Sequence, residues 1–86
     1  MEKDIINQIP SEILLRSVIA NNLKQLRKKH GLTQEELANI SGLHRVTIAK
    51  YEKCKLSISL ITLLQLAKVL GEPVAALLDG YEEIDF

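Results

Sequence analysis

The chain has 86 residues, which fits one small domain, and its 47% hydrophobic content is enough for a globular core. The single cysteine, Cys54, excludes an internal disulfide and suits a reducing cytoplasm. We expect no signal peptide and no membrane-spanning segment, because the apolar runs are too short. The net charge is zero, yet residues 16–55 hold nine Lys and Arg against three Glu, a net charge of +6 between acidic ends. That local charge would attract a phosphate backbone.

Residues 1–15 are predicted to form an N-terminal arm or an extra helical turn ahead of the main domain, which covers residues 16–79. Apolar residues between Ile13 and Leu26 recur at near-helical spacing. They predict a helix with cations in its last turn and Gly31 as a left-handed cap. Whether residues 12–17 join this helix or form a separate turn stays open.

The sharpest signal is Thr33-Gln34-Glu35-Glu36, a capping box with Thr at the N-cap and Glu three residues later. It predicts a short helix to about Ser41 that ends at Gly42. A second helix is expected over residues 45–53, after about three residues. Two short helices joined by a glycine-containing turn are typical of a helix-turn-helix.

The last third of the main domain predicts two more helices. Ser59 is a suitable N-cap for Leu60–Leu70, Gly71 ends that helix, and Pro73 begins a short one over residues 74–78. The core-facing stripe expected on the longer helix is Leu60, Leu63, Leu64, Ala67 and Leu70. Residues 80–86 read as an acidic tail. Five helices without strand-like alternation predict a compact all-α domain.

Several of these segments together resemble the phage repressor and Cro-type helix-turn-helix proteins, also called the xenobiotic-response-element family, over roughly residues 19–78. The matching stretches are Leu26-Arg27, Gly31-Leu32-Thr33-Gln34-Glu35-Glu36-Leu37-Ala38, Gly42-Leu43, Ile48, Tyr51-Glu52 and Leu63-Leu64-Gln65-Leu66-Ala67-Lys68-Val69-Leu70-Gly71. The resemblance implies a lambda-repressor-like domain with its helix-turn-helix in helices 2–3. It further implies sequence-specific binding of a double-stranded DNA operator and regulation of transcription, most often repression.

The resemblance also assigns structural roles within the motif. Ala38 would lie where the two helices cross, and Gly42 would take the left-handed turn position. Ile48 and Tyr51, with Leu37 and Leu43, would anchor the crossing in the core. Arg27 and Glu52 would form a partly buried ion pair, the alternative being a solvated Arg27.

The N-terminal part of the second motif helix would read base edges, while the first motif helix would rest on the backbone. The base readers implied are Arg45, Val46 and Lys50. An arginine can fork onto guanine and an apolar side chain can contact a thymine methyl. The expected phosphate contacts are Thr33, Gln34, His44, Thr47, Lys53 and Lys55. The alternative for each is an ordinary solvated surface residue.

Two positions depart from the family pattern. His44 stands where Ser or Thr usually caps the recognition helix, so the cap is weaker or His44 serves a phosphate. Cys54 stands where the family often has Gly. The loop there either takes another geometry or carries strain on the order of 1 kcal/mol. Two flanking lysines would favour the Cys54 thiolate, although a small tolerated side chain is the simpler interpretation.

We expect no enzyme activity, no metal and no cofactor, because neither a nucleophile–base set nor a ligand cluster is present. A homodimer would supply affinity for two half-sites. Its surface could comprise Val74, Leu77, Leu78 and Phe86, or Ile5, Ile6, Ile9 and Leu14, unless these residues extend the core. One alternative function is an antitoxin-like module that binds its own operator and holds a protein partner through the acidic tail. Another is a relic that keeps the fold without binding DNA.

Overall fold

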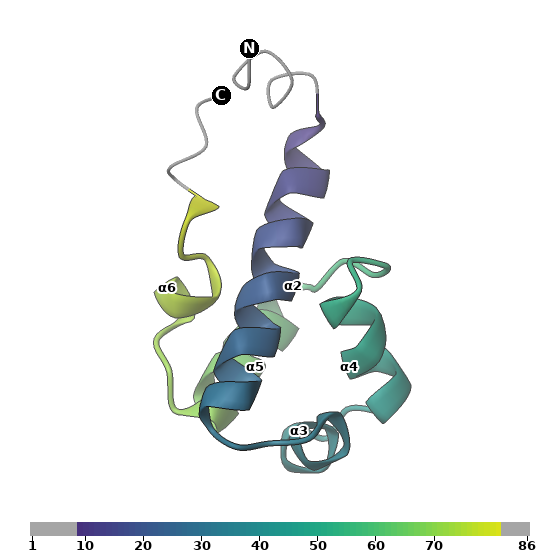
Figure 1. The fold of residues 1–86 in the computed structure, drawn as a ribbon, viewed down its shortest axis with the longest axis vertical. Coiled ribbons are helices and arrows are strands. Elements are labelled where there is room, and N and C mark those ends of the chain that lie inside the picture. The colour runs from purple at the N-terminus through teal and green to yellow at the C-terminus, as the bar shows by residue number, and fades with distance from the viewer. Residues whose placement is uncertain (1–8, 82–86) are drawn as a thin grey trace.

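The computed structural model describes residues 9–81, and the secondary structure of this part is entirely helical. The helices are α2 (Ser11–Lys29), α3 (Gln34–Ser41), α4 (Arg45–Glu52), α5 (Leu60–Leu70) and α6 (Val74–Leu77) (Figure 1). The expected five-helix all-α fold is confirmed for this part of the chain. Expectations for Ile5, Ile6, Phe86 and most of the acidic tail lie outside the described residues.

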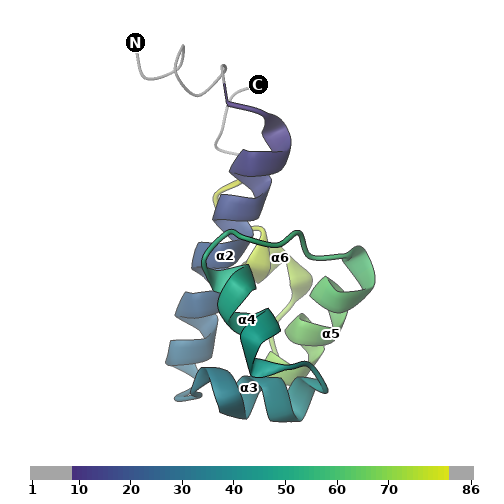
Figure 2. The ribbon, with the colours of Figure 1, turned by 90° about the vertical axis from the view of Figure 1, so that its right-hand side faces the viewer.

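The longest helix, α2, starts at Ser11, so residues 12–17 belong to it and do not form a separate turn. Its N-terminal half projects beyond the other helices (Figures 1 and 2). Its C-terminal half packs into the body of the domain through Ile19, Leu23 and Arg27. Three cations in the last turn complement the helix dipole, and Gly31 follows with a φ of 69°. This geometry turns the chain toward α3.

The two motif helices are positioned by local signals. Thr33 and Glu36 form the complete capping box, each side chain bonding the other residue's backbone N–H at 3.0 Å. Gly42 ends α3 in the left-handed conformation at φ 74°, where a β-carbon would be strained. Helix α4 then starts at Arg45 and rises from α3 (Figure 2). The helix-turn-helix is therefore formed over residues 34–52.

The core is aliphatic and lies where α2, α3, α4, α5 and α6 meet. Its fully buried apolar side chains are Leu23, Leu37, Ile48, Leu66 and Leu77. Ala38 is 3% exposed, small enough for the close packing of α3 against its neighbours.

One expectation about the core was wrong in detail, and one open alternative is decided. On α5 the buried positions are Leu63, Leu66, Ala67 and Leu70, whereas Leu60 and Leu64 are exposed. Leu77 is completely buried, so it belongs to the core and is not available as a dimer surface. Val74 and Leu78 are half-buried against the same core.

Two amides connect segments that are distant in sequence. The side chain of Asn22 donates to the carbonyls of Leu77 and Asp79, each at 2.9 Å, and so holds the end of α6 against α2. The side chain of Gln65 donates to the carbonyl of Ser41, one of the last carbonyls of α3.

None of the helices within residues 9–81 has both the length and the apolar character needed to cross a membrane.

Candidate nucleic-acid interface

The outward side of α4 carries the three expected base readers. Arg45, Val46 and Lys50 are all exposed, and the apolar Val46 retains 58% of its accessible surface. Ile48 and Tyr51 point to the opposite side and are buried. Within residues 9–81 the side chains of Arg45 and Lys50 form no hydrogen bond or ion pair. The outward face of α4 therefore presents two cations, Arg45 and Lys50, that have no partner within residues 9–81, together with the exposed apolar side chain of Val46.

The expected phosphate contacts are more dispersed. Thr33, His44, Lys53 and Lys55 are exposed, and Thr47 is half-buried. They lie at the N-cap of α3, at the N-terminal end of α4 and in the segment that leaves α4. His44 occupies the N-cap of α4 with an extended backbone, φ −80° and ψ 145°, but its side chain makes no capping hydrogen bond.

A shallow open groove of about 380 Å³ joins the N-terminal ends of α3 and α4. Arg27, Thr33, Gln34, Glu35 and Arg45 line it. It brings the expected base reader Arg45 beside two expected phosphate contacts. Backbone N–H groups at a helix N-terminus, together with guanidinium groups, favour an anion in such a groove. Glu35 is the acidic member of the lining and opposes this effect.

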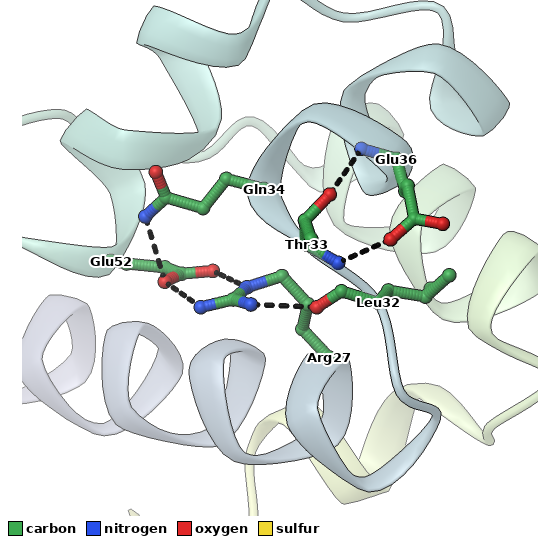
Figure 3. A network of polar contacts seen from close by, with 6 residues as sticks. All are labelled: Arg27, Leu32, Thr33, Gln34, Glu36 and Glu52. Atoms are coloured by element: carbon green, nitrogen blue, oxygen red, sulfur yellow. Dashed lines mark hydrogen bonds and ion pairs between the residues drawn. The ribbon is translucent and has the colours of Figure 1, made fainter.

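A polar network that includes Arg27 and Gln34 from the groove lining connects α2, α3 and α4 (Figure 3). The Arg27 guanidinium donates to both carboxylate oxygens of Glu52, from Nε at 2.7 Å and from Nη2 at 3.0 Å. Its Nη1 donates to the carbonyl of Leu32 at 2.7 Å. The ion pair is thus present, and the alternative of a solvated Arg27 is wrong. The pair fixes the end of α4 against α2.

Gln34 takes part in this network, which the sequence did not indicate. Its Nε2 donates to Oε1 of Glu52 at 3.1 Å, so the carboxylate joins α2, α3 and α4. One amide hydrogen is therefore committed within the protein. The bonds to Glu52 raise the pKa of Arg27 above its usual value, against the opposing effect of burial. Hydrogen bonds also lower the pKa of Glu36, here from the backbone N–H and the side chain of Thr33.

The segment after α4 has an unusual backbone. Cys54 adopts a φ of 60°, the left-handed region in which side chains with a β-carbon are strained. Of the two alternatives at this position, the loop keeps the left-handed geometry and carries the strain. Lys55 N–H donates to the carbonyl of Lys50 at 2.9 Å, which closes the end of α4. The exposed Cys54 thiol lies 4.0 Å from the carbonyl of Arg16 on α2.

Comparison with known proteins agrees with this architecture. A helix-turn-helix family model, HTH_3, matches residues 23–77. The chain belongs to the HTH_3 helix-turn-helix family. Members of this family bind DNA and regulate transcription, so the sequence-based expectation of a phage repressor-type regulator is confirmed at that level. The family model stops short of the first twelve residues of α2, Ser11 to Asn22, which include its projecting half.

Individual relatives of this HTH_3 protein include a control protein, a restriction-modification controller protein and a hypothetical transcription factor. Control protein C.SmaI of Serratia marcescens is 41% identical over 64 residues, covering 74% of this chain and 76% of the relative. The crystal structure of the restriction-modification controller protein C.AhdI of Aeromonas hydrophila has a TM-score of 0.69 at 34% identity, over 72% of this chain and 94% of that one. The crystal structure of the hypothetical transcription factor NHTF from Neisseria has a TM-score of 0.76 at 34% identity, over 88% of this chain and 87% of that one.

Other relatives are longer than this HTH_3 chain. It spans 18% of one archaeal regulatory protein that is 37% identical over 57 residues. It spans 41% of a Vibrio cholerae regulator with a TM-score of 0.78. What this protein shares with those relatives is therefore the DNA-binding domain.

Proposed function

We propose that this chain is a transcriptional repressor that binds a double-stranded DNA operator as a homodimer and reads each half-site with α4. The observation that carries this proposal is the outward side of α4, where Arg45 and Lys50 have no partner within residues 9–81 and Val46 is 58% exposed. An apolar side chain between two free cations suits a groove that offers both thymine methyls and guanine acceptors.

The phosphate contacts proposed are Thr33, Gln34, His44, Thr47, Lys53 and Lys55. They belong to the start of α3, the start of α4 and the segment that leaves α4, and they would fix the register of α4 on the duplex. Gln34 would contribute its second amide hydrogen, because the first is bonded to Glu52. The role proposed is binding without catalysis, in the cytoplasm where the operator lies.

The dimer surface proposed is the exposed apolar face of α5. Leu60, Ile61 and Leu64 retain 69%, 80% and 48% of their accessible surface. Apolar side chains grouped at adjacent helical positions favour burial against another protein surface. Leu60, Ile61 and Leu64 belong to α5 and the proposed base readers belong to α4, so a second copy could cover this face and leave Arg45, Val46 and Lys50 open to DNA. Two-fold pairing would match two half-sites.

The test of base reading begins with selection of bound sequences from a random DNA pool. Arg45→Ala and Lys50→Ala should each weaken binding to the selected site by about five- to 150-fold, because a bidentate base contact contributes about 1–3 kcal/mol. Lys24→Ala removes the same charge from the exposed side of α2 and should leave affinity nearly unchanged. Unchanged affinity of the double variant Arg45→Ala/Lys50→Ala would contradict the proposal.

The test of the dimer surface is sedimentation equilibrium. Ile61→Glu should shift the chain toward monomer, because it places a charge in the proposed interface. Ile13→Glu is the matched control, since Ile13 is 52% exposed on α2. A dimer that is lost with Ile13→Glu and kept with Ile61→Glu would instead favour the N-terminal surface.

A further inference from the structure

A cavity lies outside the DNA-binding surface, between the N-terminal half of α2 and the segment that leaves α4. Its volume is about 210 Å³. Its lining residues are Glu12, Leu15, Arg16, Ile19, Tyr51, Leu56, Ser57 and Ile58. Most of the lining is apolar, and the polar groups Glu12, Arg16 and Ser57 come from both sides. Residues 12–19 of this lining lie outside the part matched by the family model, so the family match does not include this wall of the cavity.

The side chains of Glu12, Arg16 and Ser57 are already paired with one another, but one buried donor of Arg16 is not. Arg16 Nη2 donates to Oε1 of Glu12 at 2.7 Å, and the Ser57 hydroxyl donates to the same oxygen at 3.3 Å. Arg16 Nε is buried and has no acceptor within residues 9–81. A buried donor without an acceptor is costly, and such a group points to a missing hydrogen-bond partner.

From this combination we infer that the cavity binds a small, mainly apolar molecule carrying one neutral hydrogen-bond acceptor, which takes the free donor of Arg16. The volume is below the roughly 300–1,000 Å³ of pockets for drug-sized ligands, so the ligand is small. The acceptor is neutral because Glu12 already compensates the charge of Arg16. The carboxylate of an acidic ligand would be repelled by the Glu12 carboxylate in the cavity lining.

The ligand would also contact the helix that carries the proposed base readers. Tyr51 belongs to α4 and lines the cavity, one turn after Ile48 in the core. Leu56, Ser57 and Ile58 belong to the segment leading from α4 to α5. Residues from α2, α4 and this segment would therefore share one bound molecule.

The probe for the test is 2-octanone, which has an apolar chain and one carbonyl oxygen. Titrated into the full-length chain without DNA, it should give saturable amide shifts in the NMR spectrum at Leu15, Arg16, Tyr51 and Ile58. Ser57→Phe places a large side chain at the cavity and should remove these shifts. Ser17→Phe, the same substitution at an exposed position of α2 outside the lining, should keep them.

A second pair of probes tests the hydrogen bond itself. Arg16→Met keeps the aliphatic stem and should weaken 2-octanone binding about tenfold, while binding of toluene, which has no such acceptor, stays within about twofold. Octanoate should bind more weakly than 2-octanone to the unchanged chain. Absence of saturable shifts with 2-octanone, or tighter binding of octanoate, would overturn the inference. So would nuclear Overhauser contacts placing Ile5 or Ile6 of the ligand-free chain inside the cavity.

Discussion

Arg27 and Glu52 form a bidentate ion pair across 25 residues of sequence, with Nε 2.7 Å from Oε2 and Nη2 3.0 Å from Oε1. The side chain of Glu52 is only 3% exposed. Its carboxylate is therefore stabilised by partners within the protein and hardly by water. Removing the arginine would leave a buried charge with the weaker Gln34 amide as its remaining bond within residues 9–81.

Arg27→Met should therefore lower the free energy of unfolding by about 3–5 kcal/mol in urea titrations. The double variant Arg27→Met/Glu52→Leu should recover most of that loss, because it removes both charges together. Lys24→Met makes the same change on the exposed side of α2 and should stay within about 0.5 kcal/mol of the parent. If Arg27→Met unfolds the chain outright, circular dichroism of the double variant still tests the explanation. A loss below about 1 kcal/mol for the single variant would contradict it.

A stronger cap on α4 should stabilise the protein. His44 has the extended backbone of an N-cap residue but makes no capping bond, so His44→Ser supplies an acceptor for the first turn of α4. We expect a gain of about 0.5–1 kcal/mol, or a rise in Tm of roughly 2–8 °C. Ser59→Ala is the reverse control, since Ser59 accepts from Thr62 N–H at the start of α5, and it should lose about 1 kcal/mol. An unchanged or lower Tm for His44→Ser would refute this account.

The stability contributed by Glu72 should depend on pH. His30 Nε2 lies 2.7 Å from its carboxylate and Lys29 Nζ lies 3.1 Å from it, and these two groups lower the pKa of Glu72 below its usual 4.5. A lowered pKa gives stability that is present above the ordinary value and is lost as the pH falls through the lower value in the folded state. Glu72→Gln should thus be less stable than the parent at neutral pH, with the difference shrinking below pH 4.5. A difference between Glu72→Gln and the parent that is constant from pH 7 to 3 would contradict the assignment.

Relief of the strained backbone at Cys54 should also be measurable. Cys54→Gly removes the β-carbon at φ 60° but adds entropy to the unfolded chain. The net effect should be a stabilisation on the order of 0.5–1 kcal/mol in urea titrations under reducing conditions. Cys54→Val should be destabilising, because a β-branched residue fits the left-handed region poorly. A glycine variant less stable than the parent would show that the Cys54 side chain contributes more than its backbone costs.

Short-range signals predicted the motif well. The capping box of Thr33 and Glu36 and the left-handed Gly42 depend on neighbours within four residues, so the sequence alone specifies them. The face of α5 could not be predicted as well. Nearly every position of Leu60–Leu70 is apolar, so periodicity did not distinguish Leu66, which is buried, from Leu64, which is exposed.

The candidate site was predictable where it follows from helix geometry and less so where it depends on tertiary approach. The outward position of Arg45 and Lys50 follows from the inward position of Ile48 and Tyr51. The bonds from Gln34 to Glu52 and from Gln65 to Ser41 span 18 and 24 residues, and no local sequence pattern predicts them. Gln65 is one of three polar residues on α5, beside Thr62 and Lys68, so its polarity alone did not indicate the bond to Ser41.

The left-handed Cys54 also has a consequence at the level of the gene. Both cysteine codons become glycine codons through a change of their first base alone. A single point mutation to Cys54→Gly would therefore remove the backbone strain. A library of single-base variants selected for thermal resistance should return Cys54→Gly repeatedly. If Cys54→Gly is selected only under conditions that do not require operator binding, the strained turn would contribute to DNA binding through the positions of Lys53 and Lys55.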